Sequence, residues 1–301
     1  MIRRIGSAAL WRVFRSLGRH VQMESERVTS NSRRGSYGRL AVLCSVVGGS
    51  LLLVMIQQPI GQDPGYHKFA DARTFFGIPN FLNLASNLGF LIAGTAGIWV
   101  SLVKYVGRLR SSWLVLFIGI TFVSVGSGYY HFDPNNESLV WDRLPMTVGF
   151  MGLFVAILGE YMDERLRWLL APALVVGAGS VFYWYVYEDL RLYIWVQLIP
   201  LLAIPTLIAL YRPKYSHQWL LFTALGFYIL AKSAEVYDKE IFSAAGELTG
   251  GHAVKHVLSA LGCFAIVLML RERSLLPCEN AKSVGSFKGD GEQVPPVANP
   301  A

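Results

Sequence analysis

The sequence predicts an all-α membrane protein with a core of seven transmembrane helices and one extra transmembrane helix before it. Of the 301 residues, 53% are hydrophobic and only 16% are charged, whereas about a quarter of the residues in a soluble domain are charged. Long apolar runs recur along the whole chain, so a bilayer rather than water is the expected solvent. In lipid only helices and closed barrels satisfy the backbone. These runs are too long and too continuous for alternating barrel strands.

Eight apolar spans follow one another, and each is about as long as a helix that crosses ~30 Å of hydrocarbon. They cover residues 40–57, 81–103, 112–131, 142–162, 167–187, 191–211, 216–235 and 251–270. The domain boundaries expected from them are a basic cytoplasmic segment (1–38), the extra helix (39–58), the seven-helix domain (65–272) and a polar tail (273–301). The composition of that tail is typical of disorder.

The distribution of basic residues predicts the orientation of the spans. Nine arginines lie within the first 39 residues, which favours a cytoplasmic N-terminus. If the spans alternate from there, the inner segments hold 20 lysines and arginines and the outer segments hold seven. This bias supports the assignment, and it places the outer ends of the third and eighth spans on the non-cytoplasmic side.

The few cysteines do not form a metal site, so any metal ligands are expected among the histidines, aspartates and glutamates. Cys44, Cys263 and Cys278 are widely spaced and form neither a disulfide framework nor a cysteine-based zinc site. Three of the six histidines are expected at the outer ends of spans, one closing the third span and two opening the eighth. They are His131, His252 and His256.

The spacing of these histidines is suited to a divalent metal ion. His252 and His256 are four residues apart, so a helix places both rings on one face. The helical zinc motif with two histidines has this spacing, but its glutamate is replaced here by Ala253. With His131 as the third ligand, one position of a tetrahedral zinc ion would remain for water, as in catalytic zinc sites.

Two further polar residues are candidates for catalysis beside that ion. Ser127 lies one helical turn before His131, where its hydroxyl could donate to the oxyanion of a tetrahedral intermediate. Asp142 follows eleven residues after His131, at the expected start of the next helix. A carboxylate there could orient a metal-bound water and accept its proton.

Each of these residues also has a purely structural interpretation. A histidine pair at this spacing is often incidental, and Asp142, just before Pro145, could be a helix N-cap. Ser127 lies between Gly126 and Gly128 and could serve close helix packing. Polar groups at membrane depth are costly and tend to be functional, so their convergence at one face favours a site.

More ionisable residues gather at the outer end of the seventh span. Lys232 and Glu235 are three residues apart and are expected to form an ion pair on one helix face. Asp238 and Glu240 follow just beyond. Contact with a substrate is the alternative role for this group.

The motifs together resemble those of a known family. Ser127-x-x-x-His131, Asp142-Arg-Leu-Pro-Met146 and His252-x-x-x-His256 are similar to the signature of alkaline ceramidases, within a superfamily of seven-span hydrolases that includes adiponectin-type receptors. Phe81–Asn87 looks like the start of that family's first core helix. The resemblance implies zinc ligands at the three histidines and catalytic roles for Ser127 and Asp142. The implied reaction is hydrolysis of the amide of a ceramide-like lipid to a fatty acid and a long-chain base.

The chain departs from the family pattern in two places. The resemblance implies a calcium site before the first core helix, but only Asp71 and Asn80 remain there as plausible ligands. Arg143 follows Asp142, where alkaline ceramidases commonly have glutamate. Both differences bear on which lipid is the substrate.

Three classes of function are compatible with at least some of these features. The first is a lipid amidase in a bacterial inner membrane, with its active site facing the periplasm. No nucleic-acid partner is expected for it. The second is a receptor or sensor of the same superfamily with a mainly structural zinc. Such receptors carry the zinc end toward the cytosol, whereas the charge bias here places it outside. The third, a proton-coupled transporter, would need ionisable groups near mid-membrane, and here they cluster at one end.

Overall fold

The computed structural model describes residues 37–105 and 107–277, and its regular elements there are α-helices and two short 3₁₀ helices. Most of the basic segment 1–38 and most of the tail 273–301 lie outside the described residues. The described elements begin with a helix at Tyr37–Met55. They continue with η1 (Pro64–His67), α2 (Phe81–Ala85), α3 (Leu88–Val103), α4 (Arg110–Phe132), α5 (Asn136–Tyr161), η2 (Glu164–Leu169), α6 (Leu170–Tyr187), α7 (Arg191–Leu210), α8 (Leu220–Val236), α9 (Asp238–Ala244) and α10 (Gly251–Glu272).

The predicted fold class is confirmed. Seven helices in the described part are long and apolar enough to cross a membrane, and α8 with α9 makes an eighth if this bent pair counts as one span. The bend between α8 and α9 is 83°. Each of the eight predicted spans therefore has a helix in the structure, and the apolar helices make the chain an integral multi-pass membrane protein.

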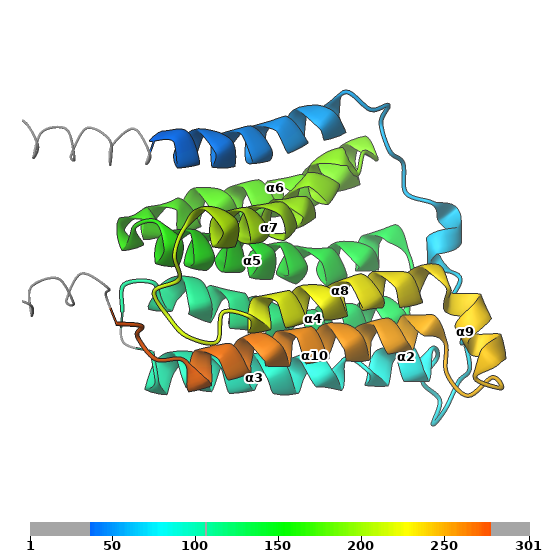
Figure 1. Ribbon diagram of the computed structural model, residues 1–301. Helices are drawn as coiled ribbons and strands as arrows, with labels where there is room; N and C mark the ends of the chain where they lie inside the picture. The colour runs from blue at the N-terminus through cyan, green and yellow to red at the C-terminus, as the bar shows by residue number, and fades with distance from the viewer. Residues whose placement is uncertain (1–36, 106, 278–301) are drawn as a thin grey trace, which may run out of the picture.

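The long helices run side by side in one bundle (Figure 1). α10 packs against α3 and α8, and α4 packs against α3 and α5. α5 in turn packs against α6 and α7. The first helix lies at the edge of the bundle beside α6 and α7 (Figure 1). The indole of Trp195 donates to the Val47 carbonyl, and the Arg191 guanidinium donates to the carbonyls of Met55 and Gln57. These bonds attach the extra helix to α7.

Glycines let α4 and α5 approach closely, and this approach positions the site. A side chain at Gly126 would overlap the backbone carbonyl of Trp141, and one at Gly119 would overlap Gly149. Small residues commonly allow such backbone contact in membranes. The contact at Gly126 holds Ser127 of α4 beside Asp142 of α5.

We expect Gly126→Ala to lower the stability of the purified protein by about 1–3 kcal/mol or more, because the added Cβ overpacks the α4–α5 contact. Gly128→Ala is a matched control on the same helix, since the nearest atom to its Cβ would be the Leu84 Cγ at 4.0 Å. Thermal unfolding in detergent measures both variants. Equal melting temperatures would show that the close approach is unimportant.

At the opposite end of the bundle a buried ion pair joins α5 to the segment after α10. Arg273 Nη1 lies 2.7 Å from Glu160 Oε1, and both side chains are almost fully buried. The Trp113 indole donates to the same carboxylate oxygen at 3.0 Å. The guanidinium also stacks on Tyr105, Trp113 and Tyr215. The sequence predicts no role for Glu160, and the structure shows that it joins α5 to the segment after α10 at the end of the bundle away from the histidines.

Candidate metal centre

Three histidines from distant parts of the chain meet inside the bundle. His131 lies in the last turn of α4, and His252 and His256 lie in the first two turns of α10. Each offers a ligand atom, and these atoms lie within 4.8 Å of one another. The ring centroids are 4.9–5.0 Å apart in all three pairs. A single ion could therefore contact all three rings.

His131 is the most strongly buried of the three, with no exposed surface. Neither of its ring nitrogens has a hydrogen-bond partner in the described part of the chain. Its backbone carbonyl accepts a hydrogen bond from Asn80 at 3.0 Å, which fixes the end of α4. An unpartnered buried imidazole is costly, and a bound cation would use its lone pair.

The ring of His256 is oriented by groups outside the cluster. Its Nδ1 lies 3.1 Å from the Asn83 carbonyl oxygen and 2.8 Å from the Ser86 hydroxyl. Donation from Nδ1 to the carbonyl leaves Nε2 as the free lone pair. Metal-binding histidines are commonly held by this kind of bond to a carbonyl or carboxylate.

The third ring, that of His252, is positioned by the start of α10. Its backbone N–H donates to Asp238 Oδ1 at 2.9 Å, and Asp238 Oδ2 accepts from the Ala70 N–H at 2.8 Å. A Cβ at Gly251 would overlap the Ala234 carbonyl, so glycine allows α10 to start close against α8. The Nε2 of His252 lies 2.8 Å from the Lys255 ammonium.

The donor set fits a metal ion. Three buried imidazoles converge, and imidazole is a common ligand for zinc and for several other first-row metals. Phe69 covers the cluster on the loop side, with its ring 4.7 Å from His131 and 4.5 Å from His252. The described residues thus provide three nitrogen ligands in a largely dehydrated space.

Ser127 and Asp142 lie together next to this cluster. Both are buried, and the Ser127 side chain lies beside the Asp142 carboxylate. The structure starts α5 at Asn136 with Asn135 as its N-cap, which is six residues before the predicted span. Asp142 is therefore not a helix cap, and its carboxylate is available to the interior of the bundle.

An apolar cavity of about 370 Å³ opens beside the polar cluster. Its polar end is lined by Ser127, Asp142, Glu235, Lys255 and His256. On α10 the lining continues to Ile266, which extends the cavity about 16 Å along the helix at 1.5 Å per residue. Its walls come from five helices, α4, α5, α7, α8 and α10, and from smaller contributions of η1 and α3. The cavity has the length and character of a site for a hydrocarbon chain.

The residues considered as calcium ligands are used otherwise in the structure. Both oxygens of Asp71 accept hydrogen bonds from the Arg73 side chain, at 2.8 and 2.7 Å. The same contact holds the pKa of Asp71 below its usual value. The Asn80 amide donates to His131, and Arg73 also reaches the Leu248 carbonyl. A cationic side chain thus neutralises the carboxylate.

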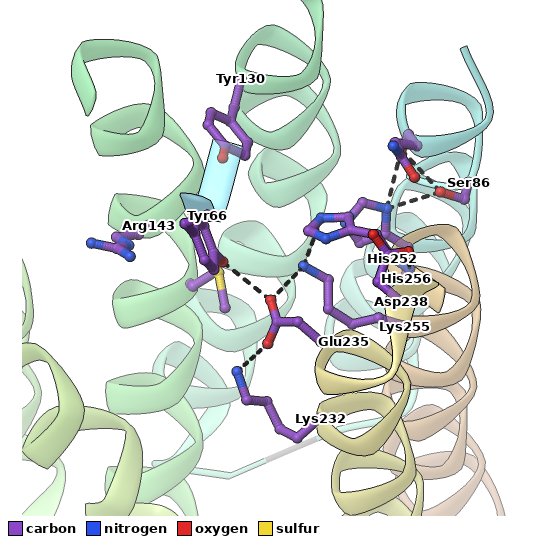
Figure 2. A network of polar contacts seen from close by, with 12 residues as sticks. Tyr66, Ser86, Tyr130, Arg143, Lys232, Glu235, Asp238, His252, Lys255 and His256 are labelled. Carbon is purple, nitrogen blue, oxygen red and sulfur yellow. Dashed lines mark hydrogen bonds and ion pairs between the residues drawn. The ribbon is translucent and has the colours of Figure 1, made fainter. Parts of the chain in front are cut away.

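Sequence reasoning missed a polar network on the α8 side of the histidines (Figure 2). The predicted ion pair between Lys232 and Glu235 is confirmed, but Glu235 also accepts hydrogen bonds from Tyr66 at 3.1 Å and from Lys255 at 3.0 Å. The only sequence feature that points to Lys255 is its position inside the histidine motif, next to His256. The contribution of Tyr66 depends on the path of a loop, which no local pattern reveals.

The fold and the site define a helical membrane protein with a buried three-histidine centre at the polar end of an apolar cavity. The family model described as Ceramidase matches residues 77–240, more than half of the chain. The chain therefore belongs to the ceramidase family, which confirms the resemblance seen in the sequence motifs. No curated protein matches the chain. Ser127, His131 and Asp142 fall inside the matched region. His252 and His256 lie beyond it in the sequence, and the packing of α10 brings them to the same site.

We expect Ser86→Ala to weaken metal binding about 10- to 100-fold, the usual effect of losing a group that orients a metal-binding histidine. The hydroxyl of Ser86 contacts the His256 ring. Ser124→Ala is the control, because that hydroxyl donates to the Thr121 carbonyl of its own helix. Competition with a metal chelator measures both affinities. A Ser86 variant as tight as wild type would exclude this orienting role.

Proposed function

We propose that this protein is a zinc-dependent hydrolase that cleaves the amide bond of a ceramide-like membrane lipid into a fatty acid and a long-chain base. The observation that carries the proposal is the three-histidine cluster, with Ser127 and Asp142 beside it, at the polar end of an apolar cavity. An acyl chain in the cavity would bring its amide to the histidines. The domain at 65–272 would be the catalytic domain.

His131, His252 and His256 would hold the zinc ion, which when bound lowers the pKa of a coordinated water and polarises the amide carbonyl. The Asp142 carboxylate accepts a proton as the water oxygen bonds to the acyl carbon. The Ser127 hydroxyl, which lines the same end of the cavity as Asp142, steadies the oxygen that gains negative charge. As the C–N bond breaks, Asp142 returns its proton to the leaving amine.

The burial of the site supports entry of the substrate from the membrane. Phe69 and the loop that carries it cover the histidines on one side, and the cavity walls are mostly apolar.

The excess of basic residues at the opposite end of the bundle favours a metal centre at the non-cytoplasmic face of the membrane. A bacterial inner membrane with the site facing the periplasm is the location that we propose.

The test combines metal analysis of the purified protein with a screen of lipid extracts for released fatty acid. We expect zinc to co-purify and a long-chain amide to be cleaved, and we expect His252→Ala to lose both properties. Unchanged zinc in purified His252→Ala would contradict the scheme. Zinc in the wild type without cleavage of any lipid amide would favour the receptor or sensor instead.

A further inference from the structure

Lys255 places a cation at the boundary between the histidine cluster and the apolar cavity. Its ammonium lies 2.8 Å from His252 Nε2 and 3.0 Å from Glu235 Oε1 (Figure 2). The side chain is 15% exposed and lines the same cavity as Ser127 and Asp142. The scheme proposed above gives no role to this residue.

The surroundings of Lys255 hold its side chain in one place. Glu235, itself only 13% exposed, accepts from Lys255, from the exposed Lys232 and from the Tyr66 hydroxyl. A buried ammonium without a counter-ion is strongly unfavourable. Glu235 offsets that cost, and its contacts with α10 and the η1 loop fix the direction of the lysine.

The hydrogen-bonding capacity of Lys255 is not exhausted by these partners. An ammonium has three N–H donors, and the described residues provide two acceptors, Glu235 and His252. A ring nitrogen has one lone pair, so a metal ion bound at His252 Nε2 would release a second N–H.

We propose that Lys255 is a catalytic residue that donates a hydrogen bond to the carbonyl oxygen of the substrate amide. This inference rests on the proposed hydrolase function. As the acyl carbon becomes tetrahedral, negative charge grows on that oxygen, and a fixed cation in a water-poor site stabilises it most at that stage. No covalent bond to Lys255 forms or breaks. Because the benefit arises in the transition state, it affects kcat more than KM.

The experiment compares Lys255→Met with Glu235→Gln and with Lys239→Met, a control that removes an exposed cation at the same end of the bundle. We expect Lys255→Met to retain zinc and KM while kcat falls about 10²- to 10³-fold, the usual effect of losing one such donor. Glu235→Gln should lose less than Lys255→Met, since the lysine remains. Lys239→Met should match wild type. Equal losses in the Lys255 and Glu235 variants would overturn the proposal, because they would assign Lys255 to the ion pair alone.

A binding measurement separates this inference from the proposed function. A long-chain alkylphosphonate carries a tetrahedral oxyanion, and palmitamide is its neutral counterpart. At equal zinc content, Lys255→Met should bind the phosphonate about 10- to 100-fold more weakly than wild type does, since a charge-assisted hydrogen bond is lost. Its affinity for palmitamide should be unchanged. Equal phosphonate affinity in both proteins overturns the role of Lys255, whereas absence of amide cleavage in wild type overturns the hydrolase.

Lys255→Arg provides a check against simple misfolding. It keeps the positive charge, so it should fold with a wild-type melting temperature and bind the phosphonate more tightly than Lys255→Met does. An arginine variant as weak as the methionine variant would contradict a role for the cation.

Discussion

His131→Ala is expected to remove the bound metal and to reduce lipid hydrolysis to background. His131 is fully buried, and neither ring nitrogen has another partner in the described part of the chain. Its removal leaves two ligands from a single helix, His252 and His256. Two imidazoles cannot complete the three-ligand set that catalytic zinc sites use. Elemental analysis and fatty-acid release from the same preparation measure both effects.

The control for this variant is a histidine at the other end of the bundle. His217 is exposed and has a positive φ of 61°, so asparagine, which tolerates this conformation, is the suitable replacement. His217→Asn should keep full metal content and activity. If His131→Ala still bound one ion per chain, the three-histidine centre would be refuted.

Asp142→Asn is expected to lower kcat by about 10²- to 10⁴-fold, the usual range for loss of a general base. The metal should stay bound, because the amide has the shape of the carboxylate and the three histidines are untouched. The amide oxygen of the new side chain could not take up a proton from the attacking water. Steady-state kinetics at measured zinc content separates catalysis from metal loss.

Asp133→Asn is the matched control for the general base. Asp133 follows α4 at the same end of the bundle and is exposed. Its substitution removes one negative charge near the site, and Asp133 is not one of the residues that line the cavity. Comparable losses in the two aspartate variants would point to a general effect of charge and would exclude Asp142 as the base.

The spans could be predicted from the sequence because the bilayer imposes a strong requirement on them. A helix must supply about 20 apolar residues to cross the hydrocarbon, and this pattern is visible without any knowledge of packing. The three histidines were found for a related reason. They lie at helix ends, where the order of spans determines the side of the membrane, so His131 and His252 were expected at the same depth.

The helix ends, the ion pairs and the loop contacts could not be predicted, because they depend on features that the lengths of the apolar spans do not encode. The apolar pattern started the fourth span at residue 142, but the polar first turns from Asn136 extend α5 beyond the apolar region. The ion pair of Glu160 with Arg273 and the reach of Lys255 to Glu235 depend on how each helix is rotated about its axis. Phe69 covers the histidines through the path of a loop. None of these contacts leaves a periodic signal.

X-ray absorption at the zinc edge tests the central claim most directly, because it reports the ligands of the ion in the intact purified protein. We expect one zinc per chain with three imidazole nitrogens at about 2.0–2.1 Å and one further light ligand. Sulfur in the coordination shell, or oxygen ligands without imidazole, would contradict a metal centre formed by His131, His252 and His256.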